Sequence, residues 1–359
     1  MADIVTARLR AQRLVGTGFA TAVEVVRHFG VVQSQDYPAA KWALALRMRS
    51  AVESAIDGAL DGGAIVRTHV FRGTWHFVAP EDVRWMLALT GPKMVRGFAA
   101  RYRELGLDDR TIARGYRVFE KALEGGNHLT RHELGAALSR AGIAPDGQRL
   151  PYLLFSGELT GLLISGERKQ GQQTYALLEQ RLPPAPAVER EEAIARLARR
   201  YFVSHGPAQL RDFVWWSGLT QLDARRGIEA SAGSLERVEV DGATYWFDAA
   251  LGAQRRGAAA AILLPNFDEY TVGYADRSAI LHPTRPFRPE LFAFSSILSN
   301  VVVIAGQVAG AWRRQAGRNA LRIEVRPLAG LDASERTLVE AAGARMSRFL
   351  GRPVTLEWL

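Results

Sequence analysis

The sequence contains no cysteine, which excludes disulfide bonds, iron–sulfur clusters, thiolate zinc sites and cysteine nucleophiles. No apolar run approaches the length of about 20 residues that a membrane-spanning helix requires. The first residues show no basic segment followed by an apolar one, the arrangement typical of a secretory signal. These absences predict a cytoplasmic protein that has no membrane partner.

Several motifs of enzyme chemistry are missing as well. Gly16 and Gly18 are not followed by the lysine of a phosphate-binding loop, and no strand precedes them. His128 and His132 are four residues apart, but Thr130 is expected to cap a helix between them, so the pair does not share one helical face. No serine lies in the glycine-flanked pattern of hydrolases. We therefore expect no metal ion and no cofactor, and a hydrolase with an activated side-chain nucleophile is disfavoured.

Lysine is scarce too, because only four of the 46 basic residues are lysines and arginine supplies nearly all of the positive charge. The 359 residues carry a net charge of +9, and the pI is about 10.1. The planar guanidinium of arginine suits phosphates and guanine edges, which indicates a nucleic-acid partner. A GC-rich genome, which favours arginine codons, explains the same composition. Composition alone leaves both interpretations open.

A helix–helix–hairpin pattern occurs in the second half of the chain. Pro207 is placed to open a helix that ends near Gly218. Thr220 is placed to cap the next helix. Asp241-Gly242, between two alternating stretches, is a strong signal for a two-residue β-hairpin. Two helices joined by a short turn and followed by a hairpin form a winged helix.

The same order is expected twice more upstream. In the second copy, Thr130 and Glu133 form a capping box, a second helix follows, and a hairpin spans residues 161–178. In the first copy, three short helices precede a hairpin over residues 64–78. A helical stretch rich in arginine, 81–123, connects the two copies.

After residue 260 the chain becomes rich in strand patterns and carries one expected helix, 334–350. Strands are expected at residues 261–265, 279–281, 301–312, 321–325 and 354–358. The fold class is therefore predicted as α+β, mainly α, with three tandem winged-helix modules followed by a small β-barrel or β-sheet domain. The expected segments are winged helix 1 (1–80), a helical connector (81–123), winged helix 2 (124–182), winged helix 3 (187–255) and the C-terminal domain (260–359).

One short segment between two expected helices, the first ending at Gly30 and the second beginning at Pro38, carries two glutamines. In an extended chain, residues two apart project to the same side, so the amides of Gln33 and Gln35 would lie side by side. They either form a polar site or satisfy backbone groups at the helix junction. Asp36 either caps the following helix or supports such a site electrostatically.

Residues suited to DNA contact fall mainly on the first hairpin and on the second helix of the third module. We expect DNA contact from Arg67, His69, Arg72, Trp75, His76, Lys41, Arg225 and Arg226. The alternative for the hairpin is an ordinary wing with Trp75 packed in the core. The alternative for Arg225 and Arg226 is a helix that packs against a neighbouring module. Asp268 and Glu269 are either catalytic carboxylates or, the favoured interpretation, caps of a loop.

Four stretches resemble the winged-helix DNA glycosylase family of bacteria (the AlkZ and YcaQ type): VVQSQDYPAAKWALALRM, VRTHVFRGTWHFV, SHGPAQLRDFVWWSGL and LLPNFDEYTVGYADR. The resemblance extends over nearly the whole chain. It implies three winged helices, a β-barrel and the removal of alkylated or crosslinked bases from double-stranded DNA. The catalytic motif of the family is a glutamine, one residue, then glutamine or aspartate, which implies a catalytic role for Gln33 and Gln35.

The chemistry of glutamine restricts the mechanism that this resemblance implies. An amide has no useful pKa, so neither glutamine can act as a general base. An N7- or N3-alkylated purine already carries positive charge and leaves without protonation, through an oxocarbenium-like state. A positioned water and fixed dipoles are then sufficient.

Two functions therefore stay open. The first is a monofunctional, monomeric glycosylase in the cytoplasm, associated with the nucleoid. The alternative is a non-catalytic winged-helix DNA-binding protein or transcriptional regulator, which would dimerise on a palindromic site.

Overall fold

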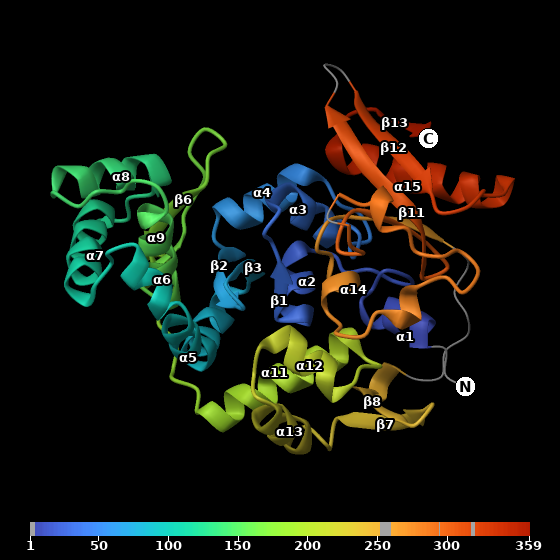
Figure 1. Cartoon of the computed structure of the whole chain (residues 1–359), viewed down its shortest axis with the longest axis horizontal. Coiled ribbons are helices and arrows are strands. Elements are labelled where there is room, and N and C mark those ends of the chain that lie inside the picture. Colours follow the sequence, from blue (N-terminus) through green and yellow to red (C-terminus); the bar gives the residue numbers. More distant parts are fainter. Residues whose placement is uncertain (1–3, 252–259, 294, 317–319) are drawn as a thin grey trace. The chain divides into compact units, whose positions relative to one another are not determined.

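The protein combines helices and strands throughout, which confirms the predicted mixed fold (Figure 1). The structure is a computed structural model that describes residues 4–251, 260–293, 295–316 and 320–359. No helix in these ranges is both long enough and apolar enough to span a membrane.

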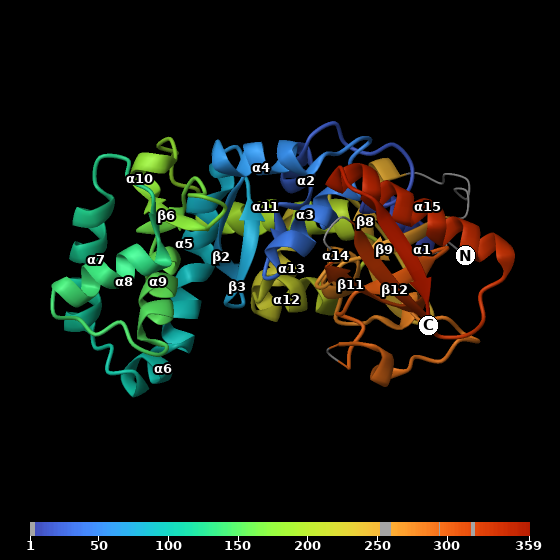
Figure 2. The same cartoon turned by 90° about the horizontal axis from the view of Figure 1, so that it is seen from above.

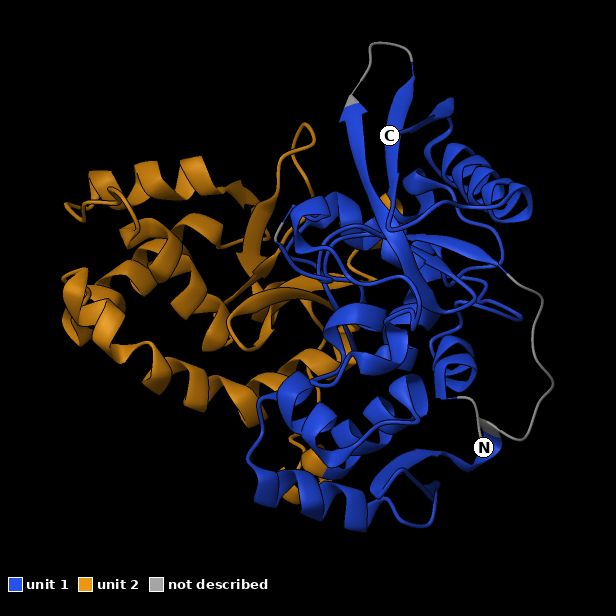
Figure 3. Ribbon diagram, turned by 45° about the vertical axis from the view of Figure 1, so that its right-hand side comes forward, with its two compact units in different colours: residues 1–56, 195–359 blue, residues 57–194 orange. Residues whose placement is uncertain are grey.

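The chain forms two compact units (Figure 3). Unit 1 comprises residues 1–56 and 195–359, and unit 2 comprises residues 57–194. The helices α4 (Glu53–Asp61) and α11 (Arg190–His205) contain the two boundaries. This division does not test the five predicted segments or the number of winged-helix modules, which stay predictions. The predicted boundary between the third module and the C-terminal domain falls on residues 252–259, outside the described residues.

Unit 2 is a helical body with three antiparallel strand pairings. Its elements are β2 (Val66–Phe71), β3 (Thr74–Val78), α5 (Pro80–Gly97), α6 (Ala99–Glu104), α7 (Asp109–Leu123), β4 (Leu129–Thr130), α8 (Arg131–Arg140), α9 (Arg149–Leu159), β5 (Leu163–Ser165), β6 (Thr174–Leu177) and α10 (Leu178–Arg181). Its core is one apolar cluster in which Phe119, Leu134 and Leu153 are fully buried. The predicted capping box is confirmed, because the side chains of Thr130 and Glu133 each accept a hydrogen bond from the backbone N–H of the other residue.

Unit 1 contains the N-terminal helices and everything after α11. Its elements are α1 (Ile4–Ala11), α2 (Ala22–Phe29), β1 (Val31–Gln33), α3 (Tyr37–Ala45), α12 (Leu210–Ser217), α13 (Gln221–Ala230), β7 (Leu235–Val240), β8 (Ala243–Asp248), η1 (Ala249–Leu251), β9 (Ala261–Leu264), α14 (Glu269–Val272), η2 (Ser278–Ile280), η3 (Pro289–Leu291), β10 (Val301–Ile304), β11 (Gln307–Ala316), β12 (Leu321–Pro327), α15 (Ala333–Leu350) and β13 (Val354–Trp358).

Local sequence signals account for the helix pair and hairpin of the predicted third module. Gly218 ends α12 in the left-handed conformation with φ +70°. The Thr220 hydroxyl accepts a hydrogen bond from the Asp223 N–H and so caps α13. Asp241 and Gly242 both have positive φ and join β7 to β8 in the predicted two-residue turn. These three predictions are confirmed.

A five-stranded sheet in the order β13-β12-β11-β10-β9 forms the C-terminal part of unit 1. Neighbouring strands are antiparallel except β12 and β13, and α15 packs against β9 and β13 (Figures 1 and 2). The Arg345 guanidinium of α15 donates to three carbonyls at the C-terminal end of α3, those of Ala45, Leu46 and Met48. The indole of Trp42 on α3 donates to the Leu263 carbonyl of the edge strand β9. These contacts join the N-terminal helices to the sheet.

Three predicted elements are wrong. Helix α12 begins at Leu210 rather than at Pro207, because the Asp212 carboxylate accepts the Gln209 N–H and so defines the first turn. The predicted strand 279–281 is largely the 3₁₀ turn η2, which the Asp276 carboxylate begins by accepting the Ser278 N–H.

The predicted single strand 301–312 is the hairpin β10–β11, whose turn at Ala305-Gly306 has positive φ at both residues. Helices α4, α11 and α14 were not expected from the sequence. The buried positions of α11 recur as pairs four residues apart (Ala193, Ile194, Leu197, Ala198, Tyr201 and Phe202), a helical period that could have identified it.

A buried ion pair ties the end of α3 to the segment before α14. The Arg47 guanidinium donates to both carboxylate oxygens of Asp268, at 2.8 and 2.9 Å, and each residue is 1% exposed. The bidentate pair compensates the charge of both groups, whereas loss of one partner leaves the other buried and uncompensated.

We predict that Asp268→Ala lowers the free energy of unfolding by about 3–5 kcal/mol, measured by urea denaturation. Asp332→Ala removes a matched but exposed helix cap and is expected to cost about 1 kcal/mol. The double variant Arg47→Met/Asp268→Leu is expected to be more stable than Asp268→Ala. Equal losses for Asp268→Ala and Asp332→Ala would contradict the role of the ion pair.

Candidate active site

The glutamine segment connects α2 to α3 in unit 1. Gly30 ends α2 with φ +80°, a conformation that glycine adopts without steric cost. The three residues of β1 follow, and the Asp36 carboxylate begins α3 by accepting the Ala39 N–H at 3.1 Å. Pro38 is the second residue of α3 rather than the predicted first, still within the turn where no backbone donor is required.

Gln33, the last residue of β1, is enclosed. Its side chain is 9% exposed, and its amide oxygen Oε1 is buried without a hydrogen-bond partner among the residues that the structure describes. Its backbone N–H donates to Oε1 of Glu269 at 2.8 Å. A buried acceptor that makes no hydrogen bond is costly and rare in proteins. This makes Gln33 Oε1 a candidate contact for a substrate or a reacting water.

Gln35 and Asp36 have different surroundings. Gln35 lies beyond the end of β1, in the bend before α3, and is exposed. Asp36 uses both carboxylate oxygens: Oδ1 accepts the Ala39 N–H and Oδ2 accepts the Asn266 side-chain amide at 3.0 Å. Asp36 therefore caps α3, which was one of the two roles expected for it from the sequence.

The Glu269 carboxylate lies behind the glutamine segment and is 1% exposed. Besides the Gln33 N–H, it accepts the Trp216 indole N–H at Oε2, at 3.0 Å. Nε2 of His205 lies 3.2 Å from the same oxygen. Three segments that are distant in sequence therefore meet at one buried acceptor, which orients β1 through its backbone.

His205 is completely buried, and burial lowers the pKa of its imidazole. The hydrogen bond to Glu269 acts in the opposite direction but is the smaller effect. Nδ1 lies 2.8 Å from the Ser204 hydroxyl. The neutral ring thus completes a polar network inside the protein and has no exposed nitrogen with which to transfer a proton to solvent.

Residues 266–269 hold the glutamine segment at both ends. Asn266 donates to Asp36 at one end, and Glu269 accepts from Gln33 at the other. Asp268 caps α14 by accepting the Tyr270 N–H, as expected. Glu269 is neither a cap nor exposed, so its role as a buried acceptor was missed. No spacing rule predicts it, although its sequence stretch is one of the four that carry the family resemblance.

The predicted DNA-binding hairpin β2–β3 belongs to unit 2. Three of its side chains, Arg67, His69 and Trp75, contact one another. The Arg67 guanidinium lies 4.3 Å from the centroid of the Trp75 ring. The centroid of the His69 ring lies 4.5 Å from that of Trp75. His69 Nδ1 is 2.7 Å from the Glu158 carboxylate, which also accepts the Trp75 indole N–H.

The other predicted DNA contacts divide between buried and exposed positions. His76 is 1% exposed, and Lys41 is 5% exposed with its ammonium 2.7 Å from the Glu53 carboxylate. Arg72, in the β2–β3 turn with φ +53°, and both Arg225 and Arg226 on α13 are exposed. Only the exposed group is positioned to meet a nucleic acid without rearrangement.

Within the described part of the chain, no three His, Asp or Glu side chains are grouped so that they could hold a metal ion.

The comparisons with known proteins decide the family. Residues 26–349 match the family of AlkZ-like DNA glycosylases. The chain belongs to the AlkZ-like DNA glycosylase family. The resemblance predicted from the sequence is therefore confirmed, and membership places the chain among hydrolases of N-glycosyl bonds that bind DNA.

Two further comparisons describe its relatives. Among solved structures, the AlkZ-like chain is similar to the DNA glycosylase AlkZ of Streptomyces sahachiroi, with a TM-score of 0.78 and 22% identity over 99% of this chain and 98% of that chain. At this identity the likeness shows the fold. A search of curated proteins returned no match.

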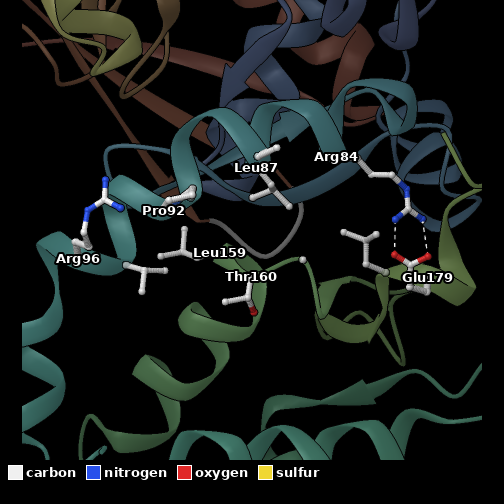
Figure 4. Close-up of a pocket in the computed structure, with 12 residues that line it drawn as sticks. Arg84, Leu87, Pro92, Arg96, Leu159, Thr160 and Glu179 are labelled. Atoms are coloured by element: carbon white, nitrogen blue, oxygen red, sulfur yellow. Dashed lines mark hydrogen bonds and ion pairs between the residues drawn. The ribbon is translucent and has the colours of Figure 1, made fainter. Parts of the chain in front are cut away.

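The AlkZ-like chain also has a cavity of about 610 Å³ in unit 2, between α5 and the end of α9 (Figure 4). Apolar side chains, among them Leu87, Pro92 and Leu159, form its middle. At one end the Arg84 guanidinium is paired with the Glu179 carboxylate, so its charge is compensated. None of the residues predicted for the site lines this cavity.

We predict that Glu269→Ala accelerates backbone amide exchange in residues 31–35, since the Gln33 N–H and the Trp216 indole lose their acceptor. A loss of about 1–3 kcal/mol per unsatisfied buried donor corresponds to roughly 5- to 150-fold faster exchange by local opening. Hydrogen–deuterium exchange with mass spectrometry measures it.

Two variants serve as controls for this prediction. Glu269→Gln retains one acceptor oxygen and is expected to show an intermediate rate. Glu340→Ala changes an exposed glutamate of α15 and should leave exchange in residues 31–35 unchanged. Unchanged exchange in Glu269→Ala would contradict the positioning role of this carboxylate.

Proposed function

We propose that this chain is a monofunctional DNA glycosylase that removes N7- or N3-alkylated purines, including bulky or crosslinked ones, from double-stranded DNA. Gln33 and Gln35 position the attacking water. The observation that carries the proposal is the enclosed amide oxygen of Gln33, an unsatisfied acceptor on a backbone that Glu269 holds in place.

The proposed step is a hydrolysis that needs no general acid. The bond between C1′ and the purine nitrogen breaks, and its electron pair neutralises the positive charge of the alkylated base. The oxygen of a water molecule bonds to C1′ and releases one proton to solvent. The products are the free alkylated base and an abasic site. Because the leaving group is already cationic, the barrier is that of forming an oxocarbenium-like sugar.

The amides lower this barrier by position and dipole. An amide oxygen accepts a hydrogen bond from the water and orients the lone pair of that water toward C1′. Fixed oxygen dipoles also stabilise positive charge that develops on the sugar. Gln33 is preorganised by its burial, whereas the exposed Gln35 is accessible to DNA. The carboxylate of Asp36, fixed by its contacts with Ala39 and Asn266, adds electrostatic support for the cation.

The exposed arginines supply the proposed contacts to the duplex. Arg72, Arg225 and Arg226 are the predicted DNA-binding residues that are exposed, whereas Arg67 and Trp75 are half-buried. The three exposed arginines are proposed to contact phosphates or groove edges. The remaining predicted contacts are proposed to support the DNA-binding surface structurally; they are Arg67, His69, Trp75, His76 and Lys41. A chain that repairs chromosomal DNA is proposed to act as a monomer, in the cytoplasm at the nucleoid.

We predict that Gln33→Ala and Gln35→Ala each lower the single-turnover rate of base release from DNA containing N7-methylguanine by about 100-fold. The freed base is quantified by chromatography under conditions where all DNA is bound. Gln172→Ala, at an exposed position of unit 2, serves as the matched control and should retain the wild-type rate. Wild-type rates in both active-site variants would refute the proposed role of the glutamine pair.

The rate of base release is expected to be independent of pH between about 6.5 and 9. Neither amide titrates, and the pKa of the buried His205 is lowered, so its ring stays neutral over this range. The measurement is the single-turnover rate on N7-methylguanine DNA across that range, with the folded state monitored by circular dichroism. A bell-shaped profile would instead require a titrating general acid or base.

A further inference from the structure

A second basic surface lies in unit 2, apart in sequence from the glutamine segment. Arg114, Arg117 and Lys121 of α7 and Arg140 of α8 line an open cavity of about 620 Å³, which we term the basic cleft. Its apolar lining residues include Val118, Ala122 and Ile143. No Asp or Glu of the described chain is among its lining residues.

The helical repeat explains why the basic side chains gather. Residues 114, 117 and 121 are spaced by three and four, so they share one face of α7 within an arc of about 60°. They extend over about 10 Å along the helix axis. Helix α7 packs against α8, and the Arg114 guanidinium donates to the Ala141 carbonyl at the end of α8. Arg140, in the last turn of α8, completes the group.

The charges of this group are not compensated. Arg117, Lys121 and Arg140 make no ion pair with any carboxylate that the structure describes, and all three are exposed. Other arginines of unit 2 differ. Arg84 pairs with Glu179 and Arg101 pairs with Glu104.

The geometry points to the phosphodiester backbone of duplex DNA as the occupant. We propose that the basic cleft binds DNA phosphates and forms a contact additional to the residues predicted for the active site; DNA as the ligand rests on the proposed function. Duplex DNA carries one negative charge per about 1.7 Å of axis, so a row of cations about 10 Å long can meet several phosphates of one strand. A free phosphate or pyrophosphate would engage only part of this row. The apolar lining residues suit the sugars between phosphates.

The salt dependence of binding tests this proposal directly. Each phosphate contact contributes about 0.9 to the slope of log K against log salt concentration. For an undamaged 30-base-pair duplex, Arg117→Gln/Lys121→Gln is expected to reduce the magnitude of this slope by about 2 and to weaken binding on the order of 10-fold at low salt. Fluorescence anisotropy between 50 and 200 mM salt measures both.

The matched control removes the same charge elsewhere in unit 2. Arg84→Gln/Arg101→Gln also lowers the net charge by two, but it removes arginines that are paired with carboxylates. Its slope should change by less than 1. Equal slopes for the two double variants would overturn the proposal, because net charge alone would then explain the effect. Inorganic pyrophosphate that binds the wild type at micromolar concentration and displaces DNA from the cleft would also overturn it, in favour of a small-anion site.

The absence of cysteine allows a second, positional test. A cleavage reagent attached to Lys121→Cys should cut bound duplex in a defined window, whereas the same reagent at Glu104→Cys, on α6, should give weaker cleavage. No cleavage above that of free reagent from a folded Lys121→Cys variant would contradict the proposal.

Failure of this inference and failure of the proposed function are distinguishable. Gln33→Ala should lower base release and keep the wild-type salt slope, whereas the basic-cleft variant should reduce the salt slope. An unchanged slope in the cleft variant, with normal base release, rejects the cleft alone. If the cleft variant shows a reduced slope but the wild-type protein releases no base, the glycosylase mechanism alone is rejected.

Discussion

The carboxylate of Glu269 is the interaction on which the arrangement of the candidate site depends. It is buried, and it accepts from the Gln33 backbone and the Trp216 indole while it faces His205. These groups come from β1, α12 and α11, so the contact exists only after the chain has folded. A buried carboxylate is tolerated because donors surround it. The same donors fix the strand that carries Gln33, and a fixed strand can present an amide oxygen that makes no hydrogen bond to the protein.

Charge is distributed in two distinct ways over this arginine-rich chain. Some arginines are structural, like Arg47, which is buried against Asp268, and Arg345, which donates to the carbonyls at the end of α3. Others, such as Arg117 and Arg140, are exposed around a cavity, and no carboxylate that the structure describes compensates their charge. The amino-acid composition counts structural and exposed arginines alike and so does not distinguish them. Only the second kind can contribute counterion release on binding DNA, since the first kind is already neutralised or buried.

Sequence patterns predicted correctly those caps and turns whose stability depends on a few neighbouring residues. The capping box of Thr130 and Glu133, the turn at Asp241-Gly242 and the helix end at Gly218 are all present as predicted, because each depends on backbone geometry within a few residues. The prediction at Pro207 was wrong, since the neighbouring pair Gln209 and Asp212 provides a better helix start. Strand 301–312 was wrong because two residues in its middle adopt positive φ.

The sequence by itself determined the mixed fold, the helix caps at Thr130 and Thr220, the turn at Asp241-Gly242 and, through its resemblance, the glycosylase family. It also marked Gln33, Gln35 and Asp36 as a unit. Tertiary structure decided what these residues experience: Gln33 is enclosed while Gln35 is exposed, and Asp36 is bound to Asn266, a residue 230 positions away. Sequence spacing encodes periodicity along one element, whereas burial and unsatisfied hydrogen-bonding capacity arise from contacts between distant elements.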